Sequence, residues 1–358
     1  MKRPLPIGLA LMLAGVVLAA LASPWETDLQ HGIQDVSQLT NRMKTHCIGR
    51  FLIDMPAEAQ VEFGQATIDG VNIASFVETR EEFKKRLAAR EAEIRAKPDQ
   101  QGGNKNLESE QLVESDHGIT GKVFVHSRMV HEGTRANGLE LERYRNEGVA
   151  LEALVHGEGI SIDLGSDYYD PDQIWRLPQL VAQLVPNPDN KIPSQSGFCM
   201  DRVYFREPLT ADQGEQIMMF GGIPKHPDVQ FMLILAAGLK PHPHGILERS
   251  ADSTGALSLW QRMRISKMRA APREIAGLPG EELVRTFAEG NGARVHSFWY
   301  EAAGTEHNVL IPHLLFKMDT GKSNNGPVPS SLSKDAALGL WDRILSSVRL
   351  HNTRSNSI

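Results

Sequence analysis

The chain contains the stretch CIGRFLI at Cys47–Ile53, and the same pattern returns as CMDRVYF at Cys199–Phe205. Each stretch begins C-x-x-R and continues into a short run of apolar and aromatic residues, a composition that favours a β-strand. A proline soon follows each run, at Pro56 and at Pro208. The repeated start indicates that the chain consists of two related halves, each opening with a strand that follows a cysteine.

The two halves also end alike. Ile160–Gly165 alternates apolar and polar residues, as a half-buried strand does, and Leu314–Gly321 closes the second half in a similar way. A linker and an amphipathic helix follow each strand. Asp170 and Ser333 stand where the N-caps of these helices are expected, and Pro178 should kink the first helix or mark its start. The apolar stripes, spaced i, i+3, i+7, i+10, are Ile174, Leu177, Val181 and Leu184 in the first half and Leu338, Trp341, Leu345 and Val348 in the second.

Between these landmarks each half carries a further helix and several antiparallel strands. The helix of the first half covers the charged stretch 81–97, and its counterpart is expected at Leu257–Met268. Turn residues at Asn137-Gly138, Glu147-Gly148 and Gly290-Asn291-Gly292 predict hairpins. The strands are expected at Lys122–Arg128, Leu139–Arg145, Ala150–His156, Glu282–Ala288, Arg294–Tyr300 and Val309–Phe316.

The sequence therefore predicts an α+β protein made of two tandem related domains, in each of which an antiparallel sheet packs with helices. The likeness of the halves indicates an internal duplication. We expect an N-terminal domain at 45–188 and a C-terminal domain at 194–351, joined by the polar, proline-bearing linker Pro186–Pro193.

Residues 1–22 have the pattern of an export signal. The chain opens with the basic Met1-Lys2-Arg3, an uncharged run follows from Leu5, and Ala20-Leu21-Ala22 supplies the small residues of a cleavage site. We expect cleavage after Ala22 and a periplasmic location. A retained anchor that tethers the protein to the inner membrane is the alternative, because the uncharged run reaches roughly the length that spans a bilayer.

The net charge of the chain restricts the kinds of partner that it can bind. The formal net charge is −6, and loss of Lys2 and Arg3 with the signal makes the remaining chain more acidic. A mildly acidic surface argues against nucleic acid and against anionic lipid headgroups as partners. It is compatible with a protein partner.

The two cysteines, Cys47 and Cys199, allow two interpretations. In an oxidising compartment such a pair readily forms a disulfide. The alternative is two separate buried thiols, since free cysteine packs as a small hydrophobic residue.

Residues that could carry catalysis are sparse. Ser161 comes close to a G-x-S-x-G pattern, but it sits in the middle of a predicted strand and not in the turn that a nucleophile needs. His242 and His244 are a close histidine pair without a third zinc ligand at diagnostic spacing. Glu140 and Glu142 share a strand face with arginines, as charges on the wet side of a sheet do. We therefore expect no catalytic, cofactor or metal residues.

The opening Cys47–Pro56, the linker end Gly197–Cys199 and the export signal resemble the immunity proteins of type VI secretion lipase effectors, in particular the group cognate to the fourth lipase family. The C-x-G-R-[FY]-hydrophobic-hydrophobic-D-x-P opening is the most specific part of the resemblance, which spans most of the chain. It implies a periplasmic protein without enzymatic activity that binds and inhibits a phospholipase effector. It also implies a two-domain clamp that holds the cap region of the lipase.

Two other functions stay open from the residues alone. One is a periplasmic hydrolase that uses His242, His244 or Ser161, and the other is an envelope protein whose two lobes close on a small ligand.

Overall fold

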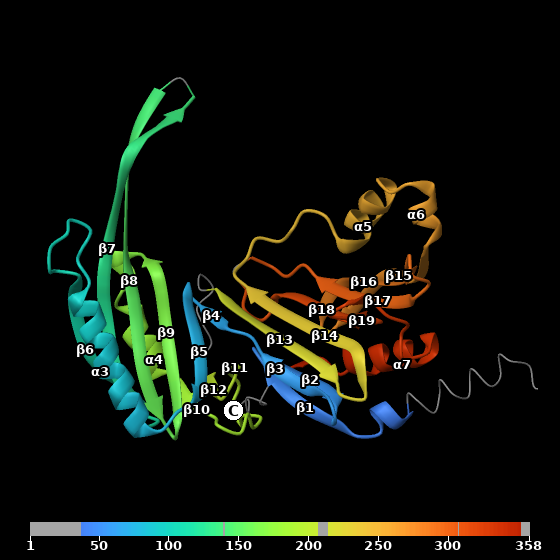
Figure 1. Ribbon diagram of the computed structural model, residues 1–358, viewed down its shortest axis with the longest axis horizontal. Helices are drawn as coiled ribbons and strands as arrows, with labels where there is room; N and C mark the ends of the chain where they lie inside the picture. The colour runs from blue at the N-terminus through green and yellow to red at the C-terminus, as the bar shows by residue number, and fades with distance from the viewer. Residues whose placement is uncertain (1–36, 139, 207–213, 307, 352–358) are drawn as a thin grey trace, which may run out of the picture.

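The structure is a computed structural model that describes residues 37–138, 140–206, 214–306 and 308–351 (Figure 1). The predicted export signal at 1–22, together with Leu139 and Pro208, lies outside the described residues. Within the described part of the chain, no helix is long and apolar enough to cross a membrane.

The elements of the first half follow the order that the sequence predicts, from a strand through a helix and antiparallel strands to a closing helix. They are β1 (Met43–Ile48), β2 (Phe51–Pro56), β3 (Gln60–Phe63), β4 (Ala66–Ile68), β5 (Val71–Val77), α3 (Arg80–Ala96), β6 (Leu107–Glu114), β7 (Thr120–Asn137), β8 (Glu140–Gly157), β9 (Ile160–Tyr169), the short 3-10 helix η1 (Pro171–Gln173), α4 (Arg176–Ala182) and β10 (Leu184–Pro186).

The second half repeats this order. Its elements are β11 (Phe198–Met200), β12 (Val203–Phe205), β13 (Glu215–Ile223), β14 (His226–Ala237), α5 (Ile246–Gly255), α6 (Leu259–Met263), β15 (Ile265–Ile275), β16 (Leu278–Ala288), β17 (Arg294–Ala302), β18 (His313–Thr320), β19 (Lys322–Ser323), β20 (Gly326–Pro327), α7 (Lys334–Leu345) and β21 (Arg349–Leu350).

The two halves share one large antiparallel sheet, in which each half has the same strand order. The first half runs β4-β5-β9-β8-β7-β6, and the second runs β13-β14-β18-β17-β16-β15. The sheets join edge to edge, because β13 pairs with β4 through Glu215 and Ile68 and with β3 through Met219 and Phe63. The α+β architecture is confirmed, and the identical strand order supports the predicted internal duplication.

The opening hairpins are exchanged between the halves. Strands β1 and β2 form a sheet with β21, which ends the second half, whereas β11 and β12 form a sheet with β10, which ends the first. Helix α7 of the second half also packs against β2. Each half of the chain therefore contributes its opening hairpin to a sheet that is completed by the last strand of the other half.

Most of the predicted stripe residues in and beside the closing helices are buried, whereas Ile174 and Leu338 are half-buried. In α7, Trp341 stacks on Phe316 with ring centroids 5.2 Å apart and lies 5.5 Å from Phe298. Ser333 is the N-cap of α7, and its hydroxyl accepts a hydrogen bond from the amide of Ala336. In α4, Pro178 lies within the first turn, where its missing amide breaks no helical hydrogen bond.

Three local predictions are wrong. The strand expected at Val309–Phe316 begins only at His313, where β18 starts. Glu147-Gly148 is no turn, because β8 runs unbroken from Glu140 to Gly157. The glycine leaves room for the ring of Tyr168, because a Cβ at Gly148 would lie 2.4 Å from that ring, which would then have to move. The predicted helix Leu257–Met268 is the short α6 followed by β15, since Ser258 and Gln261 form a capping box and Ile265 already pairs with Phe287.

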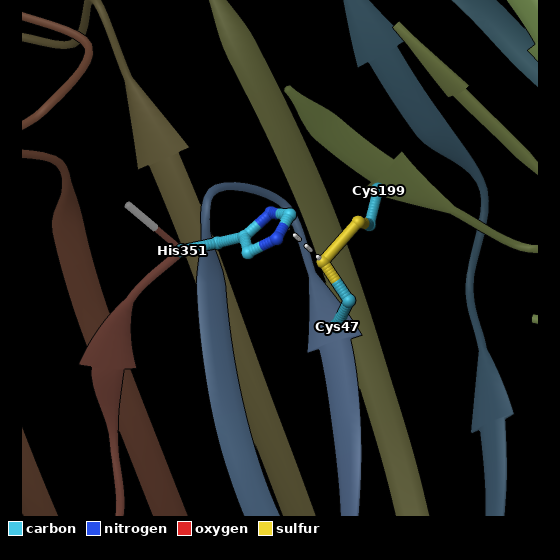
Figure 2. Close-up of side chains that lie close together, drawn as sticks. All are labelled: Cys47, Cys199 and His351. Carbon is cyan, nitrogen blue, oxygen red and sulfur yellow. Dashed lines mark hydrogen bonds between the residues drawn. A yellow bond between two sulfur atoms is a disulfide. The ribbon is translucent and has the colours of Figure 1, made fainter. Parts of the chain in front are cut away.

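A disulfide joins Cys47 of the first opening hairpin to Cys199 of the second, with an S–S distance of 2.08 Å (Figure 2). The backbones of Gly49 and Cys199 also bond to each other in both directions, at 2.9 and 2.8 Å. Gly49 has a φ of +52°, a conformation that favours glycine. The two C-x-x-R stretches, 152 residues apart, thus meet in one buried contact.

We predict that replacing both cysteines, C47S with C199S, lowers the free energy of unfolding by about 2–5 kcal/mol, because the long loop of the unfolded chain is no longer closed. Urea denaturation of the variant and of the wild type, with and without reductant, measures this.

The reduced wild type should unfold like the variant. Alkylation of the unfolded, unreduced chain should add no label to the intact mass. Equal unfolding midpoints for all samples would show that the crosslink is absent or without consequence.

Candidate protein-binding surface

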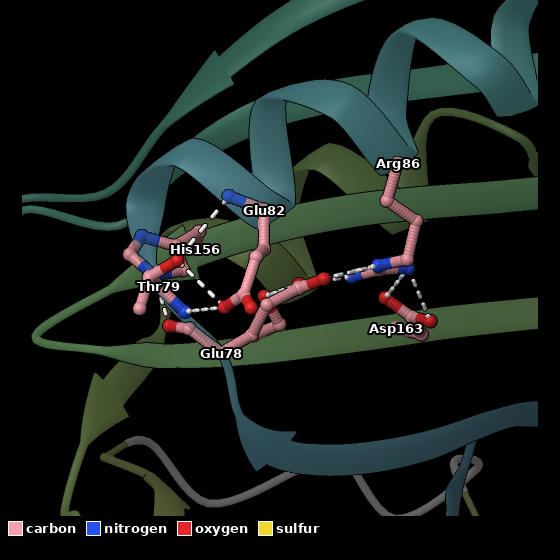
Figure 3. Close-up of polar contacts among 7 residues, drawn as sticks. Glu78, Thr79, Glu82, Arg86, His156 and Asp163 are labelled. Carbon is pink, nitrogen blue, oxygen red and sulfur yellow. Dashed lines mark hydrogen bonds and ion pairs between the residues drawn. The ribbon is translucent and has the colours of Figure 1, made fainter.

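A polar cluster joins helix α3 to the sheet of the first half (Figure 3). Arg86 donates hydrogen bonds to Glu78, from Nε to Oε1 at 3.1 Å, and to Asp163, from Nη1 to Oδ2 at 2.8 Å. Glu78 also accepts a hydrogen bond from the Ser161 hydroxyl, and its backbone carbonyl lies 2.9 Å from Nε2 of His156. These contacts fix the first turns of α3 against strands β8 and β9.

The cluster keeps Glu78 ionised. Burial acts to raise the pKa of this carboxyl, but hydrogen bonds from Arg86 and Ser161 outweigh burial and lower the pKa. Burial raises the pKa of Asp163, against the opposing effect of Arg86. Thr79 and Glu82 complete the start of α3 with a capping box.

Ser161 is a strand residue, as predicted. It lies in the middle of β9, its side chain is completely buried, and its hydroxyl already donates to Glu78. A carboxylate with a lowered pKa that is also paired to Arg86 is a weak general base. The cluster therefore has the properties of a structural anchor for α3, and not those of a nucleophile site.

The histidine pair lies in the other half. His242 and His244 are exposed in the loop between β14 and α5, where His242 Nδ1 lies 3.0 Å from the backbone oxygen of His244. His244 Nδ1 lies 2.8 Å from the Glu248 carboxylate. The structure thus does not bring Ser161, His242 and His244 together into one hydrolase site.

A buried group of three possible metal ligands consists of Cys47, Cys199 and His351 (Figure 2). A metal ion could bind the two cysteines only after their disulfide had been reduced. His351 Nδ1 faces Cys47 Sγ at 3.8 Å, and Nε2 lies 2.9 Å from the carbonyl oxygen of Pro193. Because metal sites use the thiolate form of cysteine, the joined sulfurs offer no such ligand.

A two-stranded arm, Met129–Gly148, projects from the first half and is formed by the outer ends of β7 and β8 (Figure 1). Among the described residues, no neighbouring strand pairs with the arm on either side. Strand β6 pairs with β7 only as far as His126, and β9 pairs with β8 only from Val149 onward. A two-stranded ribbon with both faces in solvent buries little surface of its own.

The side chains of the arm suit a protein contact. Arg135 pairs with Glu142 at 3.1 Å, and Arg145 pairs with Glu132. Glu142 is thus a surface charge paired across the two strands with Arg135, whereas the expected division into a wet and a covered face does not hold, because both faces of the arm are exposed. Leu141, with 77% of its surface exposed, is an apolar residue amid these charges. Exposed ion pairs contribute little to the stability of a fold. These charged side chains are therefore available to contact a binding partner.

The second half exposes an apolar helix face. The α6 face consists of Leu259, Trp260 and Met263, whose exposed fractions are 72%, 77% and 69%, and no residue of α6 is buried. Soluble proteins seldom leave such groups in water without a reason, and tryptophan is enriched among residues that dominate binding energy. Sequence reasoning missed this face by merging α6 with β15, although the Ser258-x-x-Gln261 capping signal marks its start.

Comparisons with known families agree with this architecture. The model for the N-terminal domain of Tle cognate immunity protein 4 matches residues 44–152, and the model for the C-terminal domain matches residues 191–353. The chain belongs to the Tle cognate immunity protein 4 family. A comparison with curated protein sequences finds no match.

Solved structures share the fold of this family member. The immunity protein TplEi of the T6SS from Pseudomonas aeruginosa, complexed with "L" peptide, is 22% identical with a TM-score of 0.68, over 87% of this chain and 99% of that one. A chain of the Tle4-Tli4 complex is 22% identical with a TM-score of 0.70, over 87% of this chain and 98% of that one. At this identity the likeness establishes the fold alone.

The charged contacts under α3 predict a dependence of stability on pH. Glu152 of β8 accepts hydrogen bonds from Arg90 at 2.9 Å and contacts His126 Nε2 at 3.0 Å. Burial acts to raise its pKa, but His126 and Arg90 lower the pKa from 4.5 to about 2. A lowered pKa stabilises the fold above about pH 4.5, and this stabilisation is lost as the pH falls towards about 2.

We therefore expect the stability difference between wild type and E152Q to be largest near neutral pH and to shrink as the pH falls from about 4.5 to about 2. Urea denaturation at a series of pH values measures it, with E140Q on the exposed arm as the matched control. A difference that stays constant across this range would contradict the assignment.

Proposed function

We propose that this immunity-family chain binds a type VI secreted phospholipase effector and inhibits it, without enzymatic activity of its own. The observation that carries the proposal is the match of both domain models of the immunity family, which together span most of the chain. One chain of the Tle4-Tli4 complex has the same fold as this protein, which supports a protein effector as the partner. The site of action is the periplasm, because residues 1–22 have the pattern of an export signal.

The geometry suggests which surfaces make the contact. The arm Met129–Gly148 and helix α6 both lie on the upper side of the view in Figure 1, one in each half, and α5 lies beside α6. A partner held by both surfaces would be gripped at two separate places on one frame, as in a clamp.

Clamping gives a physical mechanism of inhibition. A lipase whose cap must open to admit lipid exists as a balance of closed and open forms. A clamp that contacts the cap only in its closed position shifts this balance by its difference in affinity for the two forms. Protection of the cell requires nearly complete occupancy, which corresponds to about nanomolar affinity or near −12 kcal/mol. An interface of roughly 1,600 Å² is usual for specific complexes.

Two variants test the proposal. In one, residues 131–146 are replaced by Asn-Gly, which shortens the arm to a tight hairpin, and in the other Trp260 is changed to alanine. We expect each change to weaken binding of the cognate lipase effector by at least about tenfold, since an exposed tryptophan of this kind is a typical centre of binding energy. Calorimetry and residual phospholipase activity measure the effect.

The matched control is L112A, which removes another exposed leucine on the outer edge strand β6. It should bind like the wild type. Unchanged affinity in both test variants would refute the assignment of the surfaces, and persistent lipase activity with excess wild-type protein would refute the proposed function.

A further inference from the structure

Helix α5 and strands β15 and β16 enclose a pocket of about 480 Å³ that no part of the proposed function uses. Its volume lies in the range of small-molecule sites. Apolar side chains form much of the wall, among them Leu247, Ile265 and Leu283, and the hydroxyl residues Ser250 and Thr254 come from α5.

Two cations face each other in this pocket. Lys267 of β15 and Arg285 of β16 are direct partners across the antiparallel pair, and both line the pocket. Like charges directly opposite each other destabilise a sheet. Among the residues that the structure describes, neither side chain forms an ion pair, and no carboxylate lines the pocket. An anion bound between the two cations would offset their repulsion.

Arg285 is held in place with most of its donors unused. Its Nη1 donates to Ser250 Oγ at 3.1 Å, and its guanidinium lies 5.2 Å from the centre of the Phe287 ring. Burial lowers the pKa of this guanidinium, which shows that the charge is partly removed from water. A guanidinium has five N–H donors, so several remain for an anion.

The neighbouring acidic residue is already engaged. Glu281 precedes Arg285 on the same face of β16, where its carboxylate accepts a hydrogen bond from the amide of Leu247 at 2.9 Å. It holds the start of α5 over the sheet and so helps to form the pocket. The third basic residue of the wall, Arg262, donates instead to the backbone carbonyls of Leu257 and Gly255.

We propose that this pocket binds a single-chain amphipathic anion, such as a fatty-acid anion, with its carboxylate between Lys267 and Arg285 and its alkyl chain against Leu247, Ile265 and Leu283. Charge-assisted hydrogen bonds from a guanidinium favour a carboxylate head, and the apolar wall favours an alkyl body. Fatty-acid anions are also released when phospholipids are hydrolysed. The inference does not depend on the identity of the protein partner.

Calorimetric titration of the purified chain with octanoate, 1-octanol and acetate tests the proposal. Octanoate should bind saturably at one site, whereas the uncharged alcohol and the tail-less acetate should each bind at least about tenfold more weakly. The variants R285Q and K267Q should each weaken octanoate binding by about tenfold or more. The control R294Q, which alters an exposed arginine of β17, should leave it unchanged.

Thermal melting establishes that each variant is folded, and the exposed position of Lys267 makes K267Q an independent test should R285Q lose stability. The proposal is overturned if octanoate does not bind saturably, or if a folded K267Q binds it as the wild type does. Equal binding of acetate and octanoate would overturn it as well, since the pocket would then recognise any anion.

Discussion

The structure depends on the pairing of strand edges between its two halves. An unpaired edge strand leaves a row of amide and carbonyl groups open to other chains. Here β13 of the second half covers β4 and β3 of the first, and the exchanged opening hairpins tie the same halves together a second time. The buried ion pair between Arg50, in the turn of the first hairpin, and Glu215, at the start of β13, lies where these two connections meet. Removal of either partner would leave a buried charge alone, which is costly.

This double connection has a consequence for recognition. A hinge motion between the halves would strain the pairing of β13 with β3 and β4 and the disulfide-linked contact between the hairpins, so these contacts oppose movement of one half against the other. The arm and the α6 face are therefore held at a set separation before a partner arrives. Such preorganisation reduces the entropy lost on binding, which favours tight inhibition. It also distinguishes this protein from a two-lobed receptor whose lobes close on a small ligand. The pocket under α5 is no exception, because it lies within one half and not between the two halves.

Much of the fold follows from local sequence patterns, and the rest depends on contacts between distant residues. The sequence shows the two C-x-x-R starts directly as a repeated motif. The helical stripe around Trp341 and the strand position of Ser161 can be recognised from the spacing of apolar residues. The exchange of hairpins has no such signal, because pairing of β2 with β21 joins opposite ends of the chain. The pair Glu147-Gly148 has the local pattern of a turn, and only the folded structure shows the Tyr168 ring against Gly148 in the middle of a strand. The facing pair Lys267 and Arg285 appears only once the register of β15 and β16 is known.

If one frame grips the lipase effector through both of its halves, both halves must contact the bound effector. Amide hydrogen exchange, followed in the chain alone and in its complex with the cognate lipase effector, shows which segments make that contact. Binding should slow exchange both in the arm Met129–Gly148 and around α6, while the hairpins β1–β2 and β11–β12 should exchange slowly in either state. A stable complex in which protection is confined to one half would rule out a grip through both halves.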